Sequence, residues 1–437
     1  MNIIIAGAGK VGFNLAKTLS IGHNVTVIDK NQEAIYRIQE SLDIMPLHGD
    51  VESSKTYELF IDKKIDLFIA VTNADNINLI ATLMADSVLD IERKFVRIKN
   101  NFYGDTLIKE KLGISEMIYP IKLASKSIVS LLKYPFANNV KFFNYTPYKL
   151  ISTRTSATLE PTILSSNKFA IVGIERDKSF FIPKDDEEIY ANDLVYFFGL
   201  EEEIKSVCKR LKKTEEQSIQ KCVVFGADEL GVAIAKELVD ANRDVKLVEK
   251  DLTLCEKADE ILGGKASVIN SRYGMSTLFE DESLDSADIF ISATNNDEYN
   301  ITKCLEAREK GISKVMAINN EMEYYSLMHS LDIIIVRGPK MSAYNKILEE
   351  VNSTEVVIEK SFCGSKANIQ MRKIFPSSPH IGRSVKPIKL GSSKLYYMRD
   401  SQLFDFKEKI ILQEGDLIVA FCTTKENPKV KQWIYEL

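Results

Sequence analysis

Short apolar runs alternate with helix-like patterns along the first third of the chain. Runs of this kind, separated by helical segments of about 10–15 residues, are typical of an α/β fold with a parallel, doubly wound sheet and helices on both faces. Right-handed connections then bring the carboxyl ends of all strands to one edge, where ligands bind in this fold class. The predicted strands lie near residues 2–6, 24–28, 44–47, 66–70 and 94–98.

The helix predicted after the fourth strand has one apolar face, and a helix further along the chain repeats it. Residues spaced three or four apart lie on the same side of a helix, so we expect both faces to be buried. In the first helix the face consists of Ile77, Ile80, Ala81 and Met84, and in the second of Ile301, Cys304 and Leu305.

The sequence contains one α/β unit written twice. Four segments recur in the same order and at a nearly constant spacing, which chance does not produce. The sequence alone therefore establishes the duplication. The matching segments are 3–12 with 223–231, 25–29 with 245–249, 66–73 with 288–295, and 192–194 with 415–417.

In each half the pattern of predicted elements changes after the alternating strands and helices. From about residue 135 short strands broken by turn residues precede a helix predicted over 201–212, and the last part of the chain repeats this pattern. The polar stretch 212–220 is the predicted linker between the halves. We therefore predict two Rossmann-like domains at 1–134 and 219–345, and two small α+β domains at 135–215 and 352–437.

A glycine-rich turn follows the first predicted strand and opens a helix, which is the context that makes this fingerprint informative. Gly7 allows the tight turn, Gly9 lets the backbone approach a pyrophosphate, and Gly12 permits close packing of helix and strand. Unpaired N–H groups at the helix start attract phosphate. A ligand-free glycine turn is the alternative. The segment consists of Gly7, Ala8, Gly9, Lys10, Val11 and Gly12.

An acidic residue ends the second strand, where a carboxylate accepts hydrogen bonds from the adenosine ribose. This residue is Asp29, and a ribose 2′-phosphate would lie beside it. Like charges about 4 Å apart repel by up to ~4 kcal/mol at an effective dielectric constant near 20. The sequence therefore favours NAD(H) over NADP(H).

Further polar residues follow other strands at the same edge. Thr72 and Asn73 come after the fourth strand and contact ribose or phosphate, or else cap the next helix. Asp50 follows the third strand. Arg97 emerges from the fifth strand and pairs with a phosphate or with an acidic neighbour.

The second copy departs from the glycine fingerprint. Asp228 occupies the position of the middle glycine, where a carboxylate crowds and repels a pyrophosphate. The ribose-binding acid and the Thr-Asn pair are kept. A nucleotide site and a domain that serves only as scaffold are both open. The candidate residues are Gly226, Ala227, Asp228, Glu229, Leu230, Glu249, Thr294 and Asn295.

Composition narrows the possible partners. The chain has 57 Lys and Arg against 62 Asp and Glu, a net charge of −5, with no basic block of the kind that nucleic-acid binders carry. The 6 cysteines and 4 histidines are scattered, so we expect buried free thiols and no metal site. No apolar run approaches the ~20 residues of a membrane span, and no leader segment precedes the first strand. We expect a cytoplasmic protein.

The motifs resemble the family of peripheral nucleotide-binding subunits (TrkA) of bacterial Trk potassium-uptake systems. The resemblance covers essentially the whole chain, as two RCK-N/RCK-C pairs. It implies binding of NAD(H), with ATP or ADP as alternatives. It also implies assembly as a homo-oligomer, dimer or tetramer, on the inner face of the cell membrane. There the family gates an integral-membrane, potassium-conducting subunit.

The resemblance also implies roles for particular residues. It assigns Gly7 through Val11, Asp29, Thr72, Asn73 and Arg97 to the first site. It assigns Gly226 through Leu230 and Glu249 to the second site. In the first small domain, Asn192 stands where the family usually has glycine before Asp193.

An NAD-dependent oxidoreductase is the alternative function. Hydride transfer needs an acid or base placed near the nicotinamide. The small domains contain no His–Asp or Tyr–Lys constellation, and His48 is the only histidine predicted near the cofactor edge. A gating subunit is therefore favoured over an enzyme.

Overall fold

The computed structural model divides the chain into two compact units. Unit 1 contains Met1–Lys126 and Arg337–Val351, and unit 2 contains Ser127–Val336 and Asn352–Leu437. Most of the linker predicted at 212–220 lies outside the described residues. The domain limits predicted from the sequence stay predictions. The structure describes residues 1–100, 103, 107–143, 145–156, 165–166, 168–184, 186–211, 218–272, 275–352, 357–376 and 378–437.

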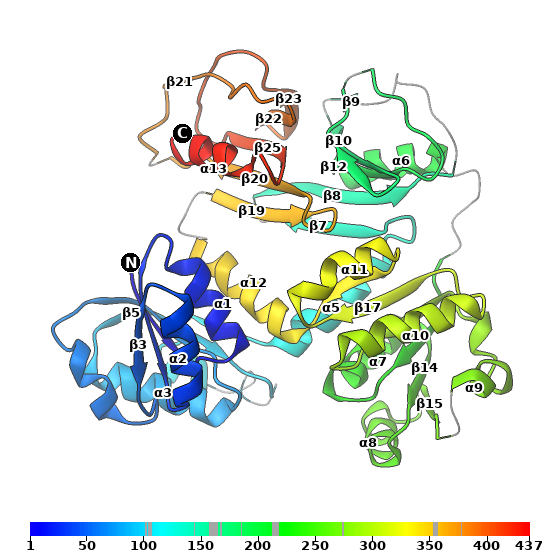
Figure 1. Cartoon of the computed structure of the whole chain (residues 1–437), viewed down its shortest axis with the longest axis horizontal. Coiled ribbons are helices and arrows are strands. Elements are labelled where there is room, and N and C mark those ends of the chain that lie inside the picture. Colours follow the sequence, from blue (N-terminus) through cyan, green and yellow to red (C-terminus); the bar gives the residue numbers. More distant parts are fainter. Residues whose placement is uncertain are drawn as a thin grey trace. The chain divides into compact units, whose positions relative to one another are not determined.

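Unit 1 is built on a parallel sheet with the strand order β3-β2-β1-β4-β5-β6 (Figure 1). The predicted doubly wound α/β fold is thereby confirmed. The order reverses between β1 and β4, and a crevice for ligands opens at such a switch point. The strands are β1 (Asn2–Ala6), β2 (Asn24–Asp29), β3 (Met45–His48), β4 (Ile65–Ala70), β5 (Ile91–Arg97) and β6 (Glu116–Ile118).

Helices bury both faces of this sheet. In β1, Ile3 and Ile5 belong to one apolar core, whereas Ile4 and Ala6 belong to the other, as the two-residue period of a strand requires. The helices are α1 (Lys10–Leu19), α2 (Gln32–Ser41), α3 (Asp75–Val88), α4 (Ile108–Lys111) and α5 (Pro120–Leu132), with short 3-10 turns η1 (Ser54–Thr56) and η2 (Glu58–Phe60).

A helix from the second repeat completes one of these cores. α12 (Pro339–Asn352) places Ala343, Ile347 and Val351 in the cluster that contains Leu15 of α1. The hydroxyl groups of Tyr344 and Thr18 are 2.8 Å apart. Unit 1 is therefore assembled from two segments that are distant in the sequence.

The buried face of α3 agrees with the predicted one except at Ile80. Ile80 is 38% exposed, and the buried residues are Asn78, Ala81, Thr82 and Ala85. Ala81 is buried and Ile77 and Met84 pack partly buried against the core as predicted, whereas small residues and an inward-pointing asparagine lie nearest the sheet and Ile80 faces outward. In α10 (Asp297–Glu309), Ile301 and Cys304 are buried as predicted, but Leu305 is 38% exposed.

Unit 2 contains a second sheet with the same strand order, β15-β14-β13-β16-β17-β18, which confirms the tandem repeat (Figure 1). The strands are β13 (Lys221–Phe225), β14 (Asp244–Glu249), β15 (Ser267–Asn270), β16 (Ile289–Ser292), β17 (Val315–Asn319) and β18 (Ile334–Arg337). Besides α10, its helices are α7 (Glu229–Asp240), α8 (Leu252–Leu262), α9 (Met275–Asp281) and α11 (Tyr325–Ser330), with η5 (Leu284–Ser286) and η6 (Met322–Tyr324).

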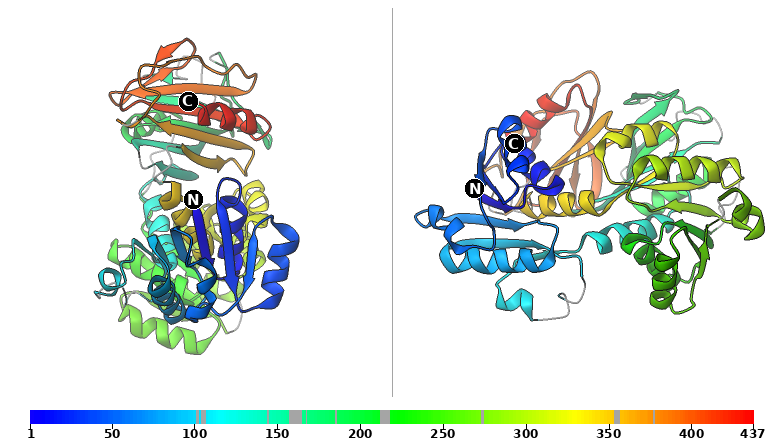
Figure 2. Two further views of the ribbon diagram at one scale, coloured as in Figure 1. Left: turned by 90° about the vertical axis from the view of Figure 1, so that its left-hand side faces the viewer. Right: turned by 60° about the horizontal axis from the view of Figure 1, so that its bottom comes forward.

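Two small antiparallel sheets complete unit 2 (Figures 1 and 2). One apolar cluster contains residues of both, so the sheets share a core. The first has β7 (Asn139–Phe143), β8 (Thr146–Arg154), β9 (Ser165–Ser166), β10 (Phe169–Arg176), β11 (Ser179–Phe181) and β12 (Leu194–Gly199), followed by α6 (Glu201–Leu211). The second has β19 (Val357–Phe362), β20 (Ala367–Lys373), β22 (Ser393–Arg399), β23 (Gln402–Asp405) and β25 (Leu417–Thr423), with the pair β21 (Ser384–Val385) and β24 (Ile410–Ile411) and the helix α13 (Asn427–Tyr435).

Each small domain contains a buried aspartate that is paired with a partly exposed arginine. Asp193 receives two hydrogen bonds from Arg176, from Nε at 3.0 Å and from Nη2 at 2.9 Å. Asp416 receives the same two bonds from Arg399, both at 2.8 Å. Such bidentate pairs fix a carboxylate in the core, so the repeated aspartate is structural.

The residue before each aspartate adopts a left-handed backbone conformation. Asn192 has a φ of 71° and Gly415 has a φ of 86°. Glycine and asparagine tolerate this region best. The asparagine in the first small domain therefore takes the backbone conformation that glycine takes in the second.

Two further features of the fold are the state of the cysteines and the length of the helices. All 6 cysteines are buried free thiols. None of the helices in the described part of the chain is long and apolar enough to cross a membrane.

We predict that Gly12→Ala destabilises the chain far more than Gly22→Ala. A Cβ at Gly12 would lie 1.8 Å from the carbonyl oxygen of Gly7, whereas a Cβ at Gly22, in an exposed turn, meets nothing within 4 Å. The first substitution should cost about 3 kcal/mol of unfolding free energy. Urea unfolding of the full-length variants measures the difference, and equal midpoints would contradict this packing.

Candidate functional site

The glycine turn after β1 lies directly against the loop after β4. Gly7 has a φ of 114°, and its N–H donates to the carbonyl of Ile28 at 2.8 Å. A Cβ at Gly7 would lie 3.0 Å from the backbone nitrogen of Thr72. Only glycine satisfies both the conformation and the close approach, so the turn is fixed at the switch point of the sheet.

The other two glycines differ in what surrounds them. Gly12 has no room for a side chain, because it packs against the carbonyl of Gly7. Gly9 is the N-cap of α1, carries no side-chain cap, and a Cβ there would meet nothing within 4 Å. The start of α1 therefore faces open space without an acceptor from its own cap residue, as an anion site requires.

Asp29 lies beside this turn at the end of β2. Its carboxylate accepts the N–H of Ala8 at 2.6 Å and the N–H of Asn31 at 2.8 Å. Arg37 on α2 donates to the carbonyl of Ala8 at 3.0 Å, and its guanidinium lies 5.3 Å from the ring centre of Phe13. Sequence reasoning missed Arg37, although it is the only basic residue of the helix that follows Asp29.

A buried asparagine holds the loop after β4. Asn78 is 1% exposed, and its Oδ1 accepts the N–H and the hydroxyl of Thr72 at 2.8 and 2.7 Å. Its Nδ2 donates to the carbonyls of Thr72 and Arg97 at 3.2 and 2.8 Å. Asn78 thus joins the ends of β4 and β5. The repeated spacing Thr-Asn-x-Asp-x-x-Asn, which recurs from Thr294, could have revealed it.

Arg97 is buried at the end of β5. It is 6% exposed, and burial lowers the pKa of its guanidinium, while the charge of Asp75 opposes that shift. Its Nε has no hydrogen-bond partner among the residues that the structure describes. A buried donor without an acceptor is unfavourable, so this group favours an anionic ligand.

The remaining residues predicted for the first site are Asp50, Asn73, Lys10 and Val11. The carboxylate of Asp50 accepts the N–H of Glu52 at 3.0 Å within its own loop. Asn73 and Lys10 are exposed, and the side chain of Val11 is buried in the core. The ligand contacts predicted for Asp50 and Val11 stay predictions.

The second copy reproduces the backbone of the turn. Gly226 has a φ of 102°, and a Cβ at Gly231 would lie 1.8 Å from the carbonyl oxygen of Gly226. Glu249 accepts the N–H of Ala227 at 2.8 Å, as Asp29 does in the first copy. Asn300 holds Thr294 by the same two bonds to its Oδ1, at 3.0 and 2.7 Å.

Asp228 changes the chemistry of this second turn. Its Oδ1 accepts the N–H groups of Leu230 and Gly231, both at 3.1 Å, and its Oδ2 accepts the side-chain amide of Asn295 at 2.8 Å. Burial raises the pKa of this carboxyl group. The start of α7 is therefore capped by a carboxylate of the chain itself.

Charge also differs between the two copies. In each copy the buried asparagine donates to a carbonyl at the end of the fifth strand of the sheet, which belongs to Arg97 in the first copy and to Ile318 in the second. The first residue of the helix is Lys10 in the first copy and Glu229 in the second. At these two positions the first copy thus has basic residues, whereas the second has an acidic and an apolar residue and also carries Asp228 at the helix start.

Two family models match this chain. The model of the TrkA-N domain matches residues 3–120 and 222–338, and that of the TrkA-C domain matches residues 160–212. The chain belongs to the TrkA family.

Curated relatives of this TrkA-family chain extend over its full length. A protein of Halomonas elongata named Trk system potassium uptake protein TrkA is 25% identical and covers 100% of this chain and 99% of its own length. One of Vibrio alginolyticus with the same name is 26% identical, covering 98% and 96%. A TrkA homolog of Archaeoglobus fulgidus is 24% identical and covers 99% of both chains.

Solved structures share the fold of this TrkA-family chain. The GsuK RCK domain has a TM-score of 0.58 at 15% identity and covers 100% of this chain and 95% of its own. The structure described as the GsuK channel bound to NAD has a TM-score of 0.59 at 15% identity, covering 100% and 79%. At these identities the likeness concerns the fold alone.

We predict that Asn78→Ala destabilises the chain and that Asn76→Ala does not. The first change leaves the N–H of Thr72 and the carbonyl of Arg97 without their partner, at a cost of about 1–3 kcal/mol for each buried group. Asn76 lies on the exposed side of the same helix. Thermal unfolding compares the two variants, and similar midpoints would argue against a structural role for Asn78.

Proposed function

We propose that this TrkA-family chain is the regulatory, nucleotide-binding subunit of a potassium-uptake system. It binds NAD(H), with ATP or ADP as alternatives, in its first TrkA-N domain, and it gates a separate membrane pore subunit. The observation that carries the proposal is the contrast between Gly9 and Asp228. The first helix start is open, and Arg97 at the end of β5 has an unpartnered Nε, whereas the second helix start is capped by a carboxylate.

The residues of the first crevice suit a dinucleotide. The N–H groups around Gly9, aided by the helix dipole, would hold the phosphate oxygens, and Arg97 would supply its unpaired donor. Asp29 uses its carboxylate for two backbone N–H groups and keeps lone pairs for ribose hydroxyls. A 2′-phosphate beside this carboxylate is disfavoured by charge, which selects NAD(H) over NADP(H).

The second TrkA-N domain serves mainly as scaffold in this proposal. Gly226, Ala227, Glu249 and Thr294 keep the shape of the turn, but Asp228 takes the N–H groups that a phosphate needs. Glu229 adds a second negative charge at the helix start. We therefore expect one nucleotide per chain.

Gating requires that the nucleotide bind two states of the assembly unequally. Couplings between sites of about 1–3 kcal/mol, or 5–150-fold in affinity, are typical. The curated relatives are named as parts of Trk potassium-uptake systems, which supports a pore-forming membrane partner. We propose that the chain assembles on it as a homo-oligomer at the cytoplasmic face, without contacting nucleic acid.

We predict that Gly9→Asp abolishes tight NADH binding, whereas Asp228→Gly leaves it unchanged. The new carboxylate would cap α1 as Asp228 caps α7 and would repel the phosphates, lowering affinity by about 100-fold. Calorimetric titration of the full-length chain with NADH measures affinity and stoichiometry. Two equal sites in the unaltered chain, or normal binding by Gly9→Asp, would refute the assignment.

We also predict that NADH changes ion flux without being consumed. The chain would be reconstituted with a candidate potassium-transport membrane subunit in liposomes, and potassium flux and NADH absorbance would be followed together. A regulator alters the flux at constant absorbance, and Gly9→Asp removes the effect. Loss of absorbance with substrate turnover would instead establish an oxidoreductase.

A further inference from the structure

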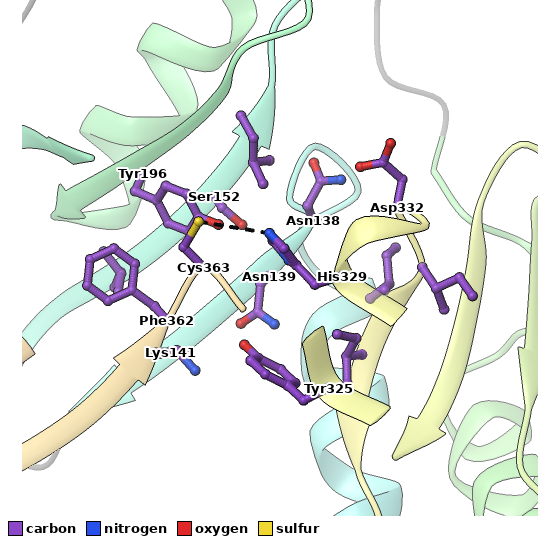
Figure 3. A pocket seen from close by; sticks show the side chains of 15 residues that line it. Asn138, Asn139, Lys141, Ser152, Tyr196, Tyr325, His329, Asp332, Phe362 and Cys363 are labelled. Carbon is purple, nitrogen blue, oxygen red and sulfur yellow. Dashed lines mark hydrogen bonds between the residues drawn. The ribbon is translucent and has the colours of Figure 1, made fainter. Parts of the chain in front are cut away.

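Three potential metal ligands from distant parts of the chain meet in unit 2. Glu175 lies on β10, His329 on α11, and Cys363 in the turn between β19 and β20. Their donor atoms all lie within 4.8 Å of one another. Nε2 of His329 is 2.7 Å from Oε2 of Glu175 and 3.9 Å from Sγ of Cys363. Figure 3 shows the imidazole and the sulfur facing one another in the wall of a cavity.

The contacts converge on a single nitrogen of the imidazole. A cysteine–histidine–acid catalytic triad would use opposite ring nitrogens for the thiol and for the carboxylate, in a line across the ring. Here both Cys363 and Glu175 contact Nε2 of His329, so the three donors surround one point. This arrangement is that of a ligand set and does not support a nucleophile with its base.

The spacing is close to that of a tetrahedral zinc site. Bonds of about 2.3 Å to sulfur and 2.0 Å to nitrogen or oxygen place sulfur and nitrogen about 3.5 Å apart and nitrogen and oxygen about 3.3 Å apart. The sulfur of Cys363 and Nε2 of His329 are 3.9 Å apart, and Nε2 and the oxygen of Glu175 are 2.7 Å apart. Each of these two distances is within about 0.6 Å of the tetrahedral value, and the sulfur of Cys363 lies within 4.8 Å of the carboxylate of Glu175.

The turn that carries the cysteine has an unusual backbone. Cys363, Gly364 and Ser365 have φ values of 52°, 60° and 67° in succession. Two of these residues are not glycine, and such a conformation is unfavourable for them unless the surroundings impose it. A Cβ at Gly364 would lie 3.1 Å from the imidazole ring of His329. The turn is thus shaped to bring the thiol and the imidazole together.

The carboxylate is held so that one oxygen faces the other donors. Lys366 donates to Oε1 of Glu175 and, at 2.6 Å, to the carbonyl of Lys178. Oε2 of Glu175 is the atom that faces His329. Both Glu175 and Cys363 are more than nine-tenths buried. The orientation of the carboxylate is therefore fixed before any ion arrives.

We propose that Glu175, His329 and Cys363 form a binding site for one thiophilic divalent cation, with Zn²⁺ as the ion that suits these donors best. Thiolate, imidazole and carboxylate are its usual ligands, and three protein ligands leave one position open. His329 and Cys363 also line the cavity, together with Asn138, Asn139, Ser152 and Tyr325. The open position of the cation is accessible from this cavity.

The cation would join three elements of unit 2 at one point. It links the first small sheet, the second TrkA-N domain and the second small sheet through their side chains. This site is independent of the nucleotide crevice, which lies in the first TrkA-N domain. A sequence scan does not find it, because 154 residues separate His329 from Glu175.

Titration of the untagged, full-length chain with Zn²⁺ alone tests the proposal. We expect one Zn²⁺ per chain by calorimetry, with affinity lowered at least about 30-fold in Cys363→Ser and in His329→Gln. Cys422→Ser is the matched control, because Cys422 is a buried cysteine of the same small domain, and it should bind normally. Unchanged affinity in both ligand variants, or no zinc binding by the unaltered chain, would overturn the site.

Cobalt spectroscopy provides a measurement that needs no variant. Co²⁺ bound to a thiolate gives a sulfur-to-metal charge-transfer band in the near ultraviolet, and Zn²⁺ should displace it. We expect this band in the unaltered chain and in Cys422→Ser. Its absence from the unaltered chain would refute coordination by Cys363, even if the ligand variants misfold.

Discussion

The first N–H groups of an α helix have no partner within the helix, and the way each copy satisfies them separates the two halves of this chain. In α1 the cap residue is Gly9, which has no side chain, so an acceptor must come from elsewhere. In α7 the cap residue is Asp228, which supplies an acceptor itself. One residue thus decides whether the start of the helix is capped by the chain itself or left open.

The features that could be predicted from the sequence are those that depend on the local conformation of the backbone. Gly7 and Gly12 could be interpreted because only glycine fits a positive φ or a close packing contact, and these needs appear as fixed spacings. The apolar face of α3 was predicted less well, because its small residues and Asn78 point inward and Ile80 does not. A period of apolar residues identifies a helix but does not choose between two neighbouring faces.

Contacts between segments that are distant in the chain could not be predicted from the sequence. Glu175, His329 and Cys363 belong to elements that meet only after three domains have folded together, and no spacing connects them. Arg37 was missed for a related reason, since its role depends on the carbonyl of Ala8. Polar residues that act on the backbone of another segment leave no periodic signal, except where a duplication repeats them, as with Asn78 and Asn300.

The position of α12 has a consequence for how the protein is made. Ala343, Ile347 and Val351 fill a core whose strands and other helices are all encoded before residue 126. During synthesis that core stays incomplete until the ribosome has passed residue 351, and by then most of the chain has emerged. Apolar surface around Leu15 is exposed for this interval, which is when nascent chains are prone to aggregate. Unit 1 therefore completes its core only after most of unit 2 has been synthesised.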